Sequence, residues 1–504
     1  MRKYSLRCAK KYLVLLSLAV IVVIGVQVVL YTHTLSHVHC IGILGHQYTS
    51  LVGDNGVTFH TLAELEKHGP SFLACLYEMY TRTLQYHCKR LRRFGEIPRK
   101  GWYLCLDFLK TSPHNCSVVS VNTAFDEFSF VKHVKKYCNT EYKKSQTRDI
   151  EKPLFDEEVD VLTFSITKAS DFVSLKKTLD TYGNRVSQLL LEIHPPDKKY
   201  AAGLIDLIST VQDLYHRDFR LVWFDIPYSC VPFFNNRNTN CISLTYVRIS
   251  SNGKHLSRAA NDDSFLLPSE GDLKQISQVE VIRALYHEYL STVQFHCKHV
   301  VRMGKVSDGG WDICHDFMFQ PSLNSPCIVF SFGIQRDFSF DNDISNTYGC
   351  YVYSFDPSMG VEDHRHSDKV YFFNKGLYDK KMVLKRQGTF WPMDSMSGIR
   401  KQLNHAKTPI NVLKMDIERS EWVALKQMLD TNQLNDVEQL LVEFHATVNK
   451  DKLLIIKRLY DIGFRIFWFH KNPYAAFYHE QIARSNANEI SFINTKFLKQ
   501  RGLL

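Results

Sequence analysis

The sequence predicts an α/β protein in which one domain occurs twice, in tandem, behind an N-terminal hydrophobic segment. Three observations predict this architecture: an apolar run near the N-terminus, an ordered series of matching motifs in the two halves, and short apolar runs that alternate with helical patterns. The chain has 504 residues, of which 45% are hydrophobic and 23% charged. These proportions are typical of folded globular domains and exclude a largely disordered chain.

Residues 12–31 form a nearly uninterrupted apolar run. As a helix, this run is long enough to cross the roughly 30 Å hydrocarbon core of a membrane. A cleaved signal peptide is the alternative, but the run is long for one and no small-x-small cleavage site follows it. Basic residues precede the run and none lies just after it, so the positive-inside rule places residues 1–11 in the cytosol. We therefore predict a single-pass type II membrane protein of the secretory pathway, with the Golgi as the preferred compartment and a luminal or extracellular body.

The net charge of +10 is concentrated near the N-terminus. Five basic residues within the first eleven carry half of it, and the rest is spread over the long body of the chain. Such a weak excess is ordinary for a soluble surface. The sequence therefore predicts no nucleic-acid partner.

A long internal match divides the body into two copies. Residues 86–89 (Tyr-His-Cys-Lys) return as residues 295–298 (Phe-His-Cys-Lys), and further motifs follow in the same order. The period is too long for a solenoid, so each copy is expected to be a whole domain. Among the later matches are Gly101-Trp102 with Gly310-Trp311, Glu192-Ile193-His194 with Glu443-Phe444-His445, and Trp223-Phe224 with Trp468-Phe469. The predicted order is a cytosolic tail 1–11, an anchor 12–31, a stem 32–70, a first copy 71–251, a linker 252–275 and a second copy 276–504.

Cysteines recur at matching positions of the two copies, which predicts a shared disulfide framework in an oxidising lumen. The sequence does not say which cysteine joins which. Cys230 and Cys241 occur only in the first copy and could close a local loop there. No CxxC or HxxxH pair occurs, so no metal site is expected. One N-glycosylation sequon, at Asn115, agrees with a luminal body. The matching cysteines are Cys88 with Cys297, Cys105 with Cys314, Cys116 with Cys327, and Cys138 with Cys350.

The second copy alternates short apolar runs with helical patterns. Such alternation predicts a parallel sheet with helices on both faces, in which ligands bind outside the carboxyl ends of the strands. The expected strands are residues 328–332, 349–355, 370–373, 410–415, 437–444, 464–469 and 490–493, and the expected helical stretches are 399–403, 421–429 and 450–460.

Small or polar residues follow several of these strands. Gly333 follows the first, where a glycine lets the backbone approach a ligand, although a simple turn is the alternative. Asp356 follows the second, where a carboxylate can bind the hydroxyls of a ribose, although a solvated turn is equally possible. Lys414, Asp416 and Glu418 alternate at the end of another strand and so point to one side. Three charges so placed indicate a ligand site rather than packing.

The next strand ends at Glu443 and His445, which fall on one face. Histidine titrates near neutrality, so this pair could take a proton from an acceptor hydroxyl. A hydrogen-bonded structural pair is the favoured alternative, because the first copy keeps Glu192 and His194 while losing other polar residues of the set.

Four blocks of the second copy, in order, resemble the methyltransferase-like protein 24 group. The last block also resembles the wider FkbM-type methyltransferases, whose strand reads Lys-apolar-Asp-apolar-Glu before a helix. The resemblance covers the chain from about residue 285 to the C-terminus. The blocks are residues 329–333 (Val-Phe-Ser-Phe-Gly), 338–341 (Phe-Ser-Phe-Asp), 355–358 (Phe-Asp-Pro-Ser) and 412–418 (Val-Leu-Lys-Met-Asp-Ile-Glu).

This resemblance implies a Rossmann-like class I fold that uses S-adenosylmethionine as methyl donor. The chain departs from the general class I pattern in its glycine-poor first loop, which lacks GxGxxG. The implied cofactor residues are Ser331, Gly333 and Ser339 on the methionine side, Asp356 at the ribose, Asp394 near the adenine, and Asp416 at the methionine end.

FkbM-type enzymes methylate hydroxyls, often of sugars, so the resemblance implies a glycan or a hydroxylated small molecule as acceptor. Glu443, His445 and Glu418 are the implied catalytic residues. The first copy lacks much of this set and is predicted to be inactive. There Gly333 corresponds to Asn122, Asp416 to Ser165 and Glu418 to Thr167, and only Glu141 lies near the position of Asp356.

Two other functions stay open. Asp341-Asn342-Asp343 resembles the DxD motif of luminal glycosyltransferases, whose aspartates hold a divalent cation and sugar-nucleotide phosphates. An Asp or Asn at the start of a helix is also an ordinary N-cap. The second alternative is that both copies are binding modules without catalysis, which the retention of Gly333, Asp356, Asp416 and Glu418 in the second copy disfavours.

Overall fold

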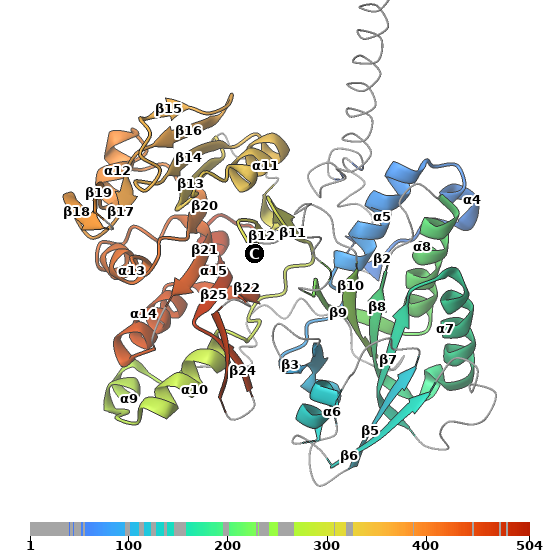
Figure 1. The fold of residues 1–504 in the computed structure, drawn as a ribbon. Coiled ribbons are helices and arrows are strands. Elements are labelled where there is room, and N and C mark those ends of the chain that lie inside the picture. The colour runs from blue at the N-terminus through green and yellow to red at the C-terminus, as the bar shows by residue number, and fades with distance from the viewer. Residues whose placement is uncertain are drawn as a thin grey trace, which may run out of the picture.

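The computed structural model shows two α/β lobes (Figure 1). It describes residues 58–504 with internal gaps, and a few positions from 40 to 57. We call residues 40–249 the N-terminal lobe and residues 267–504 the C-terminal lobe. The gaps are 96–100, 110–114, 122–127, 136–138, 146–157, 195–200, 228–229, 231–240, 250–266, 307, 319–325, 387, 446–447, 473–474 and 480–481.

The N-terminal lobe is built on a six-stranded sheet of order β6-β5-β7-β8-β10-β9, in which only the pairs made by β10 are antiparallel. Helices α5, α7 and α8 lie on one side of the sheet, and α6 with the β3–β4 hairpin lies on the other (Figure 1). Its elements are β1 (Val52–Gly53), β2 (Gly56–Val57), α4 (Leu62–Leu65), α5 (Pro70–Arg82), β3 (Leu91–Gly95), β4 (Gly101–Cys105), η1 (Leu106–Phe108), β5 (Asn115–Val121), α6 (Phe128–Val134), β6 (Asn139–Ser145), β7 (Val159–Ile166), α7 (Ala169–Tyr182), η3 (Gly183–Arg185), β8 (Val186–Ile193), α8 (Ala201–His216), β9 (Phe219–Asp225) and β10 (Ile242–Arg248).

The C-terminal lobe is built on an eight-stranded sheet of order β15-β16-β14-β13-β20-β21-β25-β22. Its elements are α9 (Glu270–Gln275), α10 (Val279–Tyr289), β11 (Val300–Met303), β12 (Trp311–Cys314), η5 (His315–Phe317), β13 (Ile328–Phe332), α11 (Ser339–Tyr348), β14 (Tyr351–Phe355), β15 (His364–Arg365), β16 (Val370–Phe373), β17 (Gly376–Leu377), β18 (Met382–Arg386), β19 (Thr389–Asp394), α12 (Met396–Gln402), β20 (Ile410–Met415), α13 (Glu421–Asp430), β21 (Val437–His445), α14 (Lys450–Asp461), β22 (Phe464–Lys471), β23 (Ala476–His479), β24 (Ile482–Ser485), β25 (Ala487–Asn494) and α15 (Thr495–Gln500).

The two sheets share one strand order. Strands β14-β13-β20-β21-β25-β22 of the C-terminal lobe correspond, one by one, to β6-β5-β7-β8-β10-β9 of the N-terminal lobe. In both lobes the strand next to the last in the sheet is antiparallel to its two neighbours. The α/β class and the parallel strands predicted for the second copy are confirmed, and each predicted strand is present within a few residues.

The central strands β13 and β21 are buried almost throughout, as expected where helices cover both faces of a sheet. Every residue of β13 is buried, and so are the first eight of the nine residues of β21. Phe330, Phe332 and Phe355 stack at the centre of the C-terminal sheet, with ring centroids 4.6 to 6.5 Å apart. This rigid centre ends at Phe332 and Phe355, directly before the loops that carry Gly333 and Asp356.

Disulfides tie each lobe together, as the cysteine pattern predicts. Cys88–Cys105 and Cys297–Cys314 occupy matching positions, and each joins cysteines 17 residues apart. Cys327–Cys350 connects the segments that lead into β13 and β14. Cys116, the counterpart of Cys327 in the repeat, is also disulfide-bonded, and Cys138 lies outside the described residues. The other two bonds are Cys230–Cys241, the predicted local loop, and Cys40–Cys75.

Two predicted connecting segments contain folded structure. Within the predicted stem, Cys40 is bonded to α5 of the N-terminal lobe, and α4 begins after the capping residue Thr61. Within the predicted linker 252–275, the last six residues form α9, where the carbonyl of Lys274 accepts a hydrogen bond from Lys450 of α14. The body therefore includes parts of both segments.

None of the described helices is both long and apolar enough to cross a membrane. The predicted anchor, residues 12–31, lies outside the described residues. The anchor stays a prediction from sequence.

Candidate functional site

A cavity of about 110 Å³ opens at the carboxyl ends of β13, β14 and β20. Four of the residues singled out in the sequence line it: Gly333, Asp356, Asp416 and Glu418. Leu377, Trp391 and Met393, from the small sheet β17-β19-β18, give it an apolar wall. The cavity therefore lies where the sequence predicts it, at the carboxyl ends of the parallel strands. The small sheet forms one wall of the cavity, and the sequence did not predict that wall.

Gly333 is required where the ends of β13 and β20 meet. Its φ is +78°, a conformation that side-chain-bearing residues rarely adopt. A Cβ there would lie 1.6 Å from the backbone oxygen of Asp416. The Lys414 ammonium ties the same junction by donating to the carbonyls of Gly333 (2.7 Å) and Phe332 (3.2 Å). A glycine at this point thus serves close packing of two site loops.

Asp356 organises the loop after β13 as well as its own. Its Oδ2 accepts from the backbone N–H of Gln335 at 2.7 Å, and its Oδ1 accepts from the N–H and hydroxyl of Ser358 at 2.8 and 2.6 Å. The side chain is buried and borders the cavity. Each carboxylate oxygen can accept two hydrogen bonds, so Oδ2 keeps a position for a hydroxyl of a ligand.

The segment after β20 has an unusual backbone. Glu418 and Arg419 have φ values of +51° and +77°. Two consecutive residues in this left-handed conformation are strained, and contacts with the surrounding structure must hold them in it. The Arg386 guanidinium, from β18, donates to the carbonyl of Glu418 at 2.6 Å and so connects the small sheet to this turn. The turn leaves the Glu418 side chain 73% exposed at the rim of the cavity.

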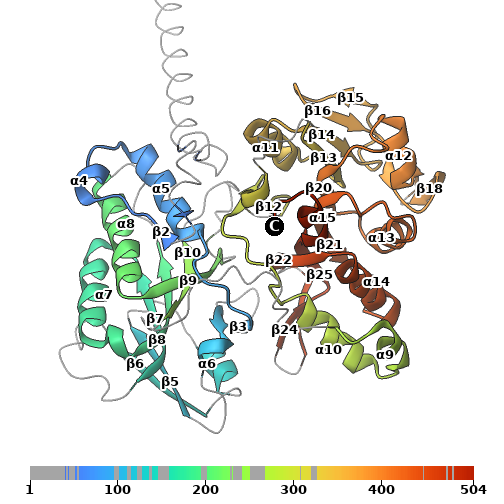
Figure 2. The ribbon, with the colours of Figure 1, turned by 180° about the vertical axis from the view of Figure 1, so that it is seen from behind.

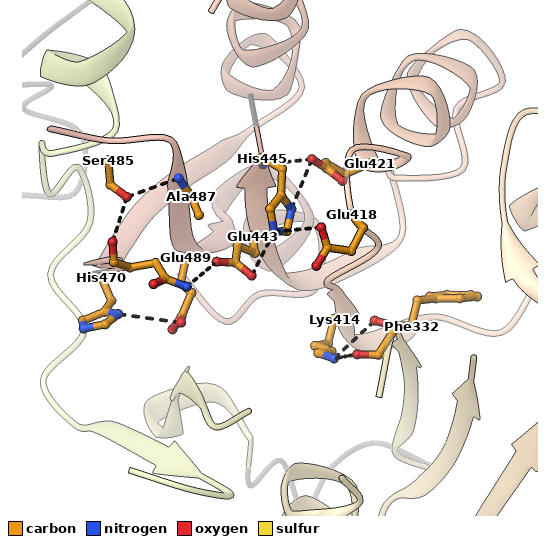
Figure 3. A network of polar contacts seen from close by, with 12 residues as sticks. Phe332, Lys414, Glu418, Glu421, Glu443, His445, His470, Ser485, Ala487 and Glu489 are labelled. Carbon is orange, nitrogen blue, oxygen red and sulfur yellow. Dashed lines mark hydrogen bonds and ion pairs between the residues drawn. The ribbon is translucent and has the colours of Figure 1, made fainter. Parts of the chain in front are cut away.

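His445 lies at the centre of a group of carboxylates (Figure 3). Its Nε2 is 3.4 Å from Glu443 Oε2 and 3.8 Å from Glu418 Oε2. Its Nδ1 is 3.5 Å from Glu421 Oε1, which also accepts from the His445 backbone N–H at 2.9 Å. Glu421 is fully buried in the first turn of α13. The ring is therefore held by one carboxylate on its Nδ1 side and presents Nε2 toward the cavity rim.

This crowding changes the proton affinity of the group. Burial raises the pKa of Glu443, and the negative charges of Asp416 and Glu489 add to this effect, to about 9. Burial alone would lower the pKa of His445, but the carboxylates of Glu421, Glu443 and Asp416 outweigh it and raise the pKa to about 9. The expectation that His445 titrates near neutrality therefore needs correction, because its carboxylate neighbours stabilise the imidazolium form.

The free energy of unfolding is expected to fall as the pH rises from about 6.5 to about 9. Together, Glu443 and His445 hold more protons over this range in the folded protein than in the unfolded chain, where their pKa values are 4.5 and 6.5. Each proton contributes at most about 1.4 kcal/mol per pH unit. Urea denaturation at several pH values measures this slope. The Glu443→Gln variant should show a shallower slope, and an equal or steeper one would contradict the assignment.

The remaining predicted cofactor residues lie outside the lining of the cavity. Ser331 is fully buried in β13, and Ser339 begins α11. Asp394 ends β19, where it accepts from the N–H of Ser395 at 2.8 Å and lies 3.8 Å from the Lys375 ammonium. Their predicted roles at the cofactor stay predictions.

The DxD-like residues have structural partners. Asp341 is buried and accepts from the Ser354 hydroxyl at 2.8 Å, and Asp343 is buried and accepts from the N–H of Gly304 at 2.9 Å. Both lie within α11 rather than at the cavity. This placement gives the two aspartates structural roles, but neither caps the helix, because Phe338 occupies the N-cap position.

A divalent cation could be held at the rim of the cavity. One ligand atom each from Asp416, Glu418 and His445 lies within 4.8 Å of the others. The sequence predicts no metal site, whereas this cluster shows which residues would bind a cation. Glu421, which contacts His445 beside the cluster, was not predicted from sequence, because helix spacing does not reveal that its side chain reaches across to β21.

Together, the sheet order and the cavity at the carboxyl ends of its strands define a Rossmann-like α/β domain. Residues 265–494 match the model of a family described as a methyltransferase domain. The particular likeness is to the methyltransferase-like protein 24 group, as the sequence blocks indicated.

The chain is 24% identical over 235 residues to the probable methyltransferase-like protein 24 of Homo sapiens, and 23% identical over 235 residues to that of Rattus norvegicus. These matches span 42% of this chain and 63% and 64% of the relatives, so less than two thirds of either relative is covered. A solved phosphoethanolamine N-methyltransferase 2 of Haemonchus contortus in complex with S-adenosyl-L-methionine is 10% identical and covers 76% of this chain and 95% of that one. Its TM-score is 0.23, which is too low to support an argument about fold or function.

Proposed function

We propose that the C-terminal lobe transfers a methyl group from S-adenosylmethionine to a hydroxyl of a glycan or a small molecule. The observation that carries this proposal is the convergence of Gly333, Asp356, Asp416 and Glu418 on one cavity. These residues come from the ends of three different strands, and only the fold brings them together.

The cavity fits the proposed cofactor in three respects. The junction at Gly333 has no room for a Cβ, which lets backbone form one wall. Asp356 keeps an acceptor position suited to a ribose hydroxyl. Leu377, Trp391 and Met393 offer an apolar surface to a flat base. Bound there, S-adenosylmethionine would supply a methyl group on a positively charged sulfur.

The residues of the chain would orient the acceptor and take its proton. Glu418 stands at the rim, where its exposed carboxylate can accept from an acceptor hydroxyl. The proton lost from the reacting oxygen would pass to Nε2 of neutral His445, whose ring Glu421 orients from the other side. The raised pKa of His445 means that this neutral form predominates on the alkaline side of about pH 9.

Label transfer tests the proposal most directly. The purified protein is incubated with methyl-labelled S-adenosylmethionine and a panel of glycans and cell extracts, with and without EDTA. Transfer to a hydroxyl supports the proposal, and EDTA sensitivity would assign a cation to Asp416, Glu418 and His445. Binding of a sugar nucleotide that depends on manganese, without label transfer, would support the glycosyltransferase alternative instead.

We also propose that the N-terminal lobe is a degenerate copy of the same domain. Two features support this: the shared strand order and the register of the strands that carry the site. Phe164 pairs with Leu191 as Met415 pairs with Val442, so Ser165 takes the place of Asp416. The Glu192–His194 contact persists at 2.8 Å, while Ser165 and Thr167 stand at the positions of Asp416 and Glu418.

Helix α7 supports the same conclusion. At the position of Glu421 this helix has Asp171, whose shorter side chain accepts from the N–H groups of Thr167 and Lys168 and so caps its own helix. In the C-terminal lobe the longer Glu421 reaches His445 instead. The N-terminal lobe thus keeps the fold and lacks the group that would orient its histidine.

The full chain is expected to bind one S-adenosylmethionine, not two. Gly333, Asp416 and Glu418 line the cavity of the C-terminal lobe. The N-terminal lobe has Asn122, Ser165 and Thr167 at the matching positions of its sequence. Isothermal titration calorimetry of the intact protein gives the stoichiometry directly. A value near two would show that the N-terminal lobe also binds and would overturn its assignment as degenerate.

We further propose that the protein is a single-pass type II membrane protein of the secretory pathway, with its body in the lumen. The apolar run at residues 12–31 and the disulfides of both lobes support this placement. Protease protection of the body in sealed microsomes is the expected result. Digestion of the body without detergent would contradict it.

A further inference from the structure

The two lobes meet through residues that occupy matching positions. His87 stacks on His296 with ring centroids 5.8 Å apart, and these are the histidines of the repeated Tyr/Phe-His-Cys-Lys motif. Trp223 stacks on Trp468 with centroids 3.8 Å apart and planes inclined by 16°, and these are the tryptophans of the repeated Trp-Phe motif. The contact runs between β9 and β22, which lie next to each other in both views (Figures 1 and 2).

The neighbouring contacts are reciprocal. Trp223 lies 5.2 Å from Phe469, and Phe224 lies 4.5 Å from Trp468. All four aromatic residues are at least 94% buried, so these faces are fully covered. The Trp of each lobe therefore contacts the Phe of the other. Such reciprocal contacts between equivalent residues are typical of the isologous interface of a two-fold symmetric dimer.

The segments around the repeated cysteines also contact each other across the two lobes. The N–H of Leu84 donates to the carbonyl of Lys298 at 2.9 Å, and Nε2 of His87 lies 3.3 Å from the carbonyl of Val293. Leu84 and Val293 are themselves counterparts in the repeat. Each of the five described disulfides joins two cysteines of the same lobe, so the described contacts between the lobes are non-covalent.

We propose that the aromatic face of the C-terminal lobe around His296, Trp468 and Phe469 is a self-complementary dimer surface, which the N-terminal lobe occupies as a partner within the same chain. The kind of partner this surface fits is a copy of the same domain. The proposal rests on the equivalence of the two lobes and does not require methyl transfer. The degenerate lobe thereby has a role that needs no active site: it takes the place of a second subunit.

The interface also borders the candidate site. Strand β22 carries Trp468 at the interface, pairs with β25, and β25 pairs in turn with β21. His470, two residues beyond Trp468, has its Nδ1 3.7 Å from Glu489 Oε1, and Glu489 is the register partner of Glu443. The covered face therefore supports the strand from which Glu443 and His445 project.

Cutting the linker tests the proposal on the intact protein. A protease site placed within residues 252–264 allows the folded chain to be cleaved, and native mass spectrometry or light scattering then shows what stays together. We expect the two fragments to remain one particle of unchanged mass. Separation of the fragments at micromolar concentration would overturn the proposal.

Self-complementarity has its own test, which leaves every residue of the interface unchanged. Cleaved protein with a tag on the C-terminal fragment is mixed with cleaved untagged protein and left to exchange. We expect the tag to capture untagged C-terminal fragments as well as N-terminal ones. If only N-terminal fragments are captured after full exchange, the face is specific to the N-terminal lobe and the proposal fails.

Matched substitutions test the symmetry of the contact. Trp223→Ala and Trp468→Ala remove opposite halves of one stack, so each should weaken reassociation of the cleaved fragments to a similar extent, about 30-fold or more (about 2 kcal/mol). The double variant should weaken it by much less than the product of the two effects, because the second substitution removes no further contact. Val173→Ala, at a residue of α7 that is 71% exposed, is the control and should have no effect. Unequal single effects with a fully multiplicative double effect would contradict a shared symmetric contact.

Discussion

Asp416→Asn is expected to reduce methyl transfer by about 10²-fold or more, the loss typical of removing one preorganised charged or polar group from an active site. Asp416 lies at the meeting point of the cavity, the Gly333 junction and the carboxylates around His445. The substitution keeps the shape and removes the negative charge. Steady-state kinetics with labelled donor, together with calorimetric titration of S-adenosylmethionine, measure the loss in rate and the loss in affinity separately.

The N-terminal lobe offers the matched control for this variant. Glu192→Gln alters the retained Glu–His pair of that lobe and should leave transfer unchanged, since no part of the candidate site lies there. If Asp416→Asn retained full activity, or if Glu192→Gln abolished it, the assignment of the site to the C-terminal lobe would be wrong.

Gly333→Ala is expected to destabilise the protein by at least about 2 kcal/mol and to abolish binding of S-adenosylmethionine. The new Cβ would stand 1.6 Å from the carbonyl oxygen of Asp416, so the ends of β13 and β20 would have to separate. A positive φ adds conformational strain. Chemical denaturation and calorimetry measure the two effects.

Gly360→Ala separates these causes. Gly360 has a similar φ of +66°, but a Cβ there has nothing within 4 Å. This variant should lose only the strain energy, about 1–2 kcal/mol, and bind the donor normally. Equal behaviour of the two variants would mean that the close approach at Gly333 has no special importance for the site.

The central strands were predictable from sequence because burial on both faces leaves mostly apolar runs. Residues 328–332 and 410–415 are such runs, interrupted by Ser331 in the first and by Asn411 and Lys414 in the second, and both are strands with those bounds. Strands β17 to β19 were missed because β17 is only two residues long, whereas β18 and β19 contain exposed positions. In β18, for example, exposed Val383 and Lys385 alternate with partly buried neighbours, which produces no apolar run.

The site residues that directly follow strands were predictable from sequence. The residue whose side chain must extend from a helix to a neighbouring strand was not. Asp356, Asp416 and Glu418 follow strands, and the sheet brings them together by construction. Glu421 sits on a helix, and its distance to His445 depends on how α13 packs against β21. The pKa of His445 could not be read from sequence for the same reason, since the charges that raise it come from three separate segments.

The short span of the disulfides bears on how the chain is made. The five described bonds join cysteines 11 to 35 residues apart, so each can close soon after its second cysteine leaves the ribosome. The N-terminal lobe can then complete its fold while the second half is still being translated. The emerging C-terminal lobe meets a finished aromatic face at Trp223 and Phe224. Its own Trp468 and Phe469 are therefore shielded from aggregation as soon as they form.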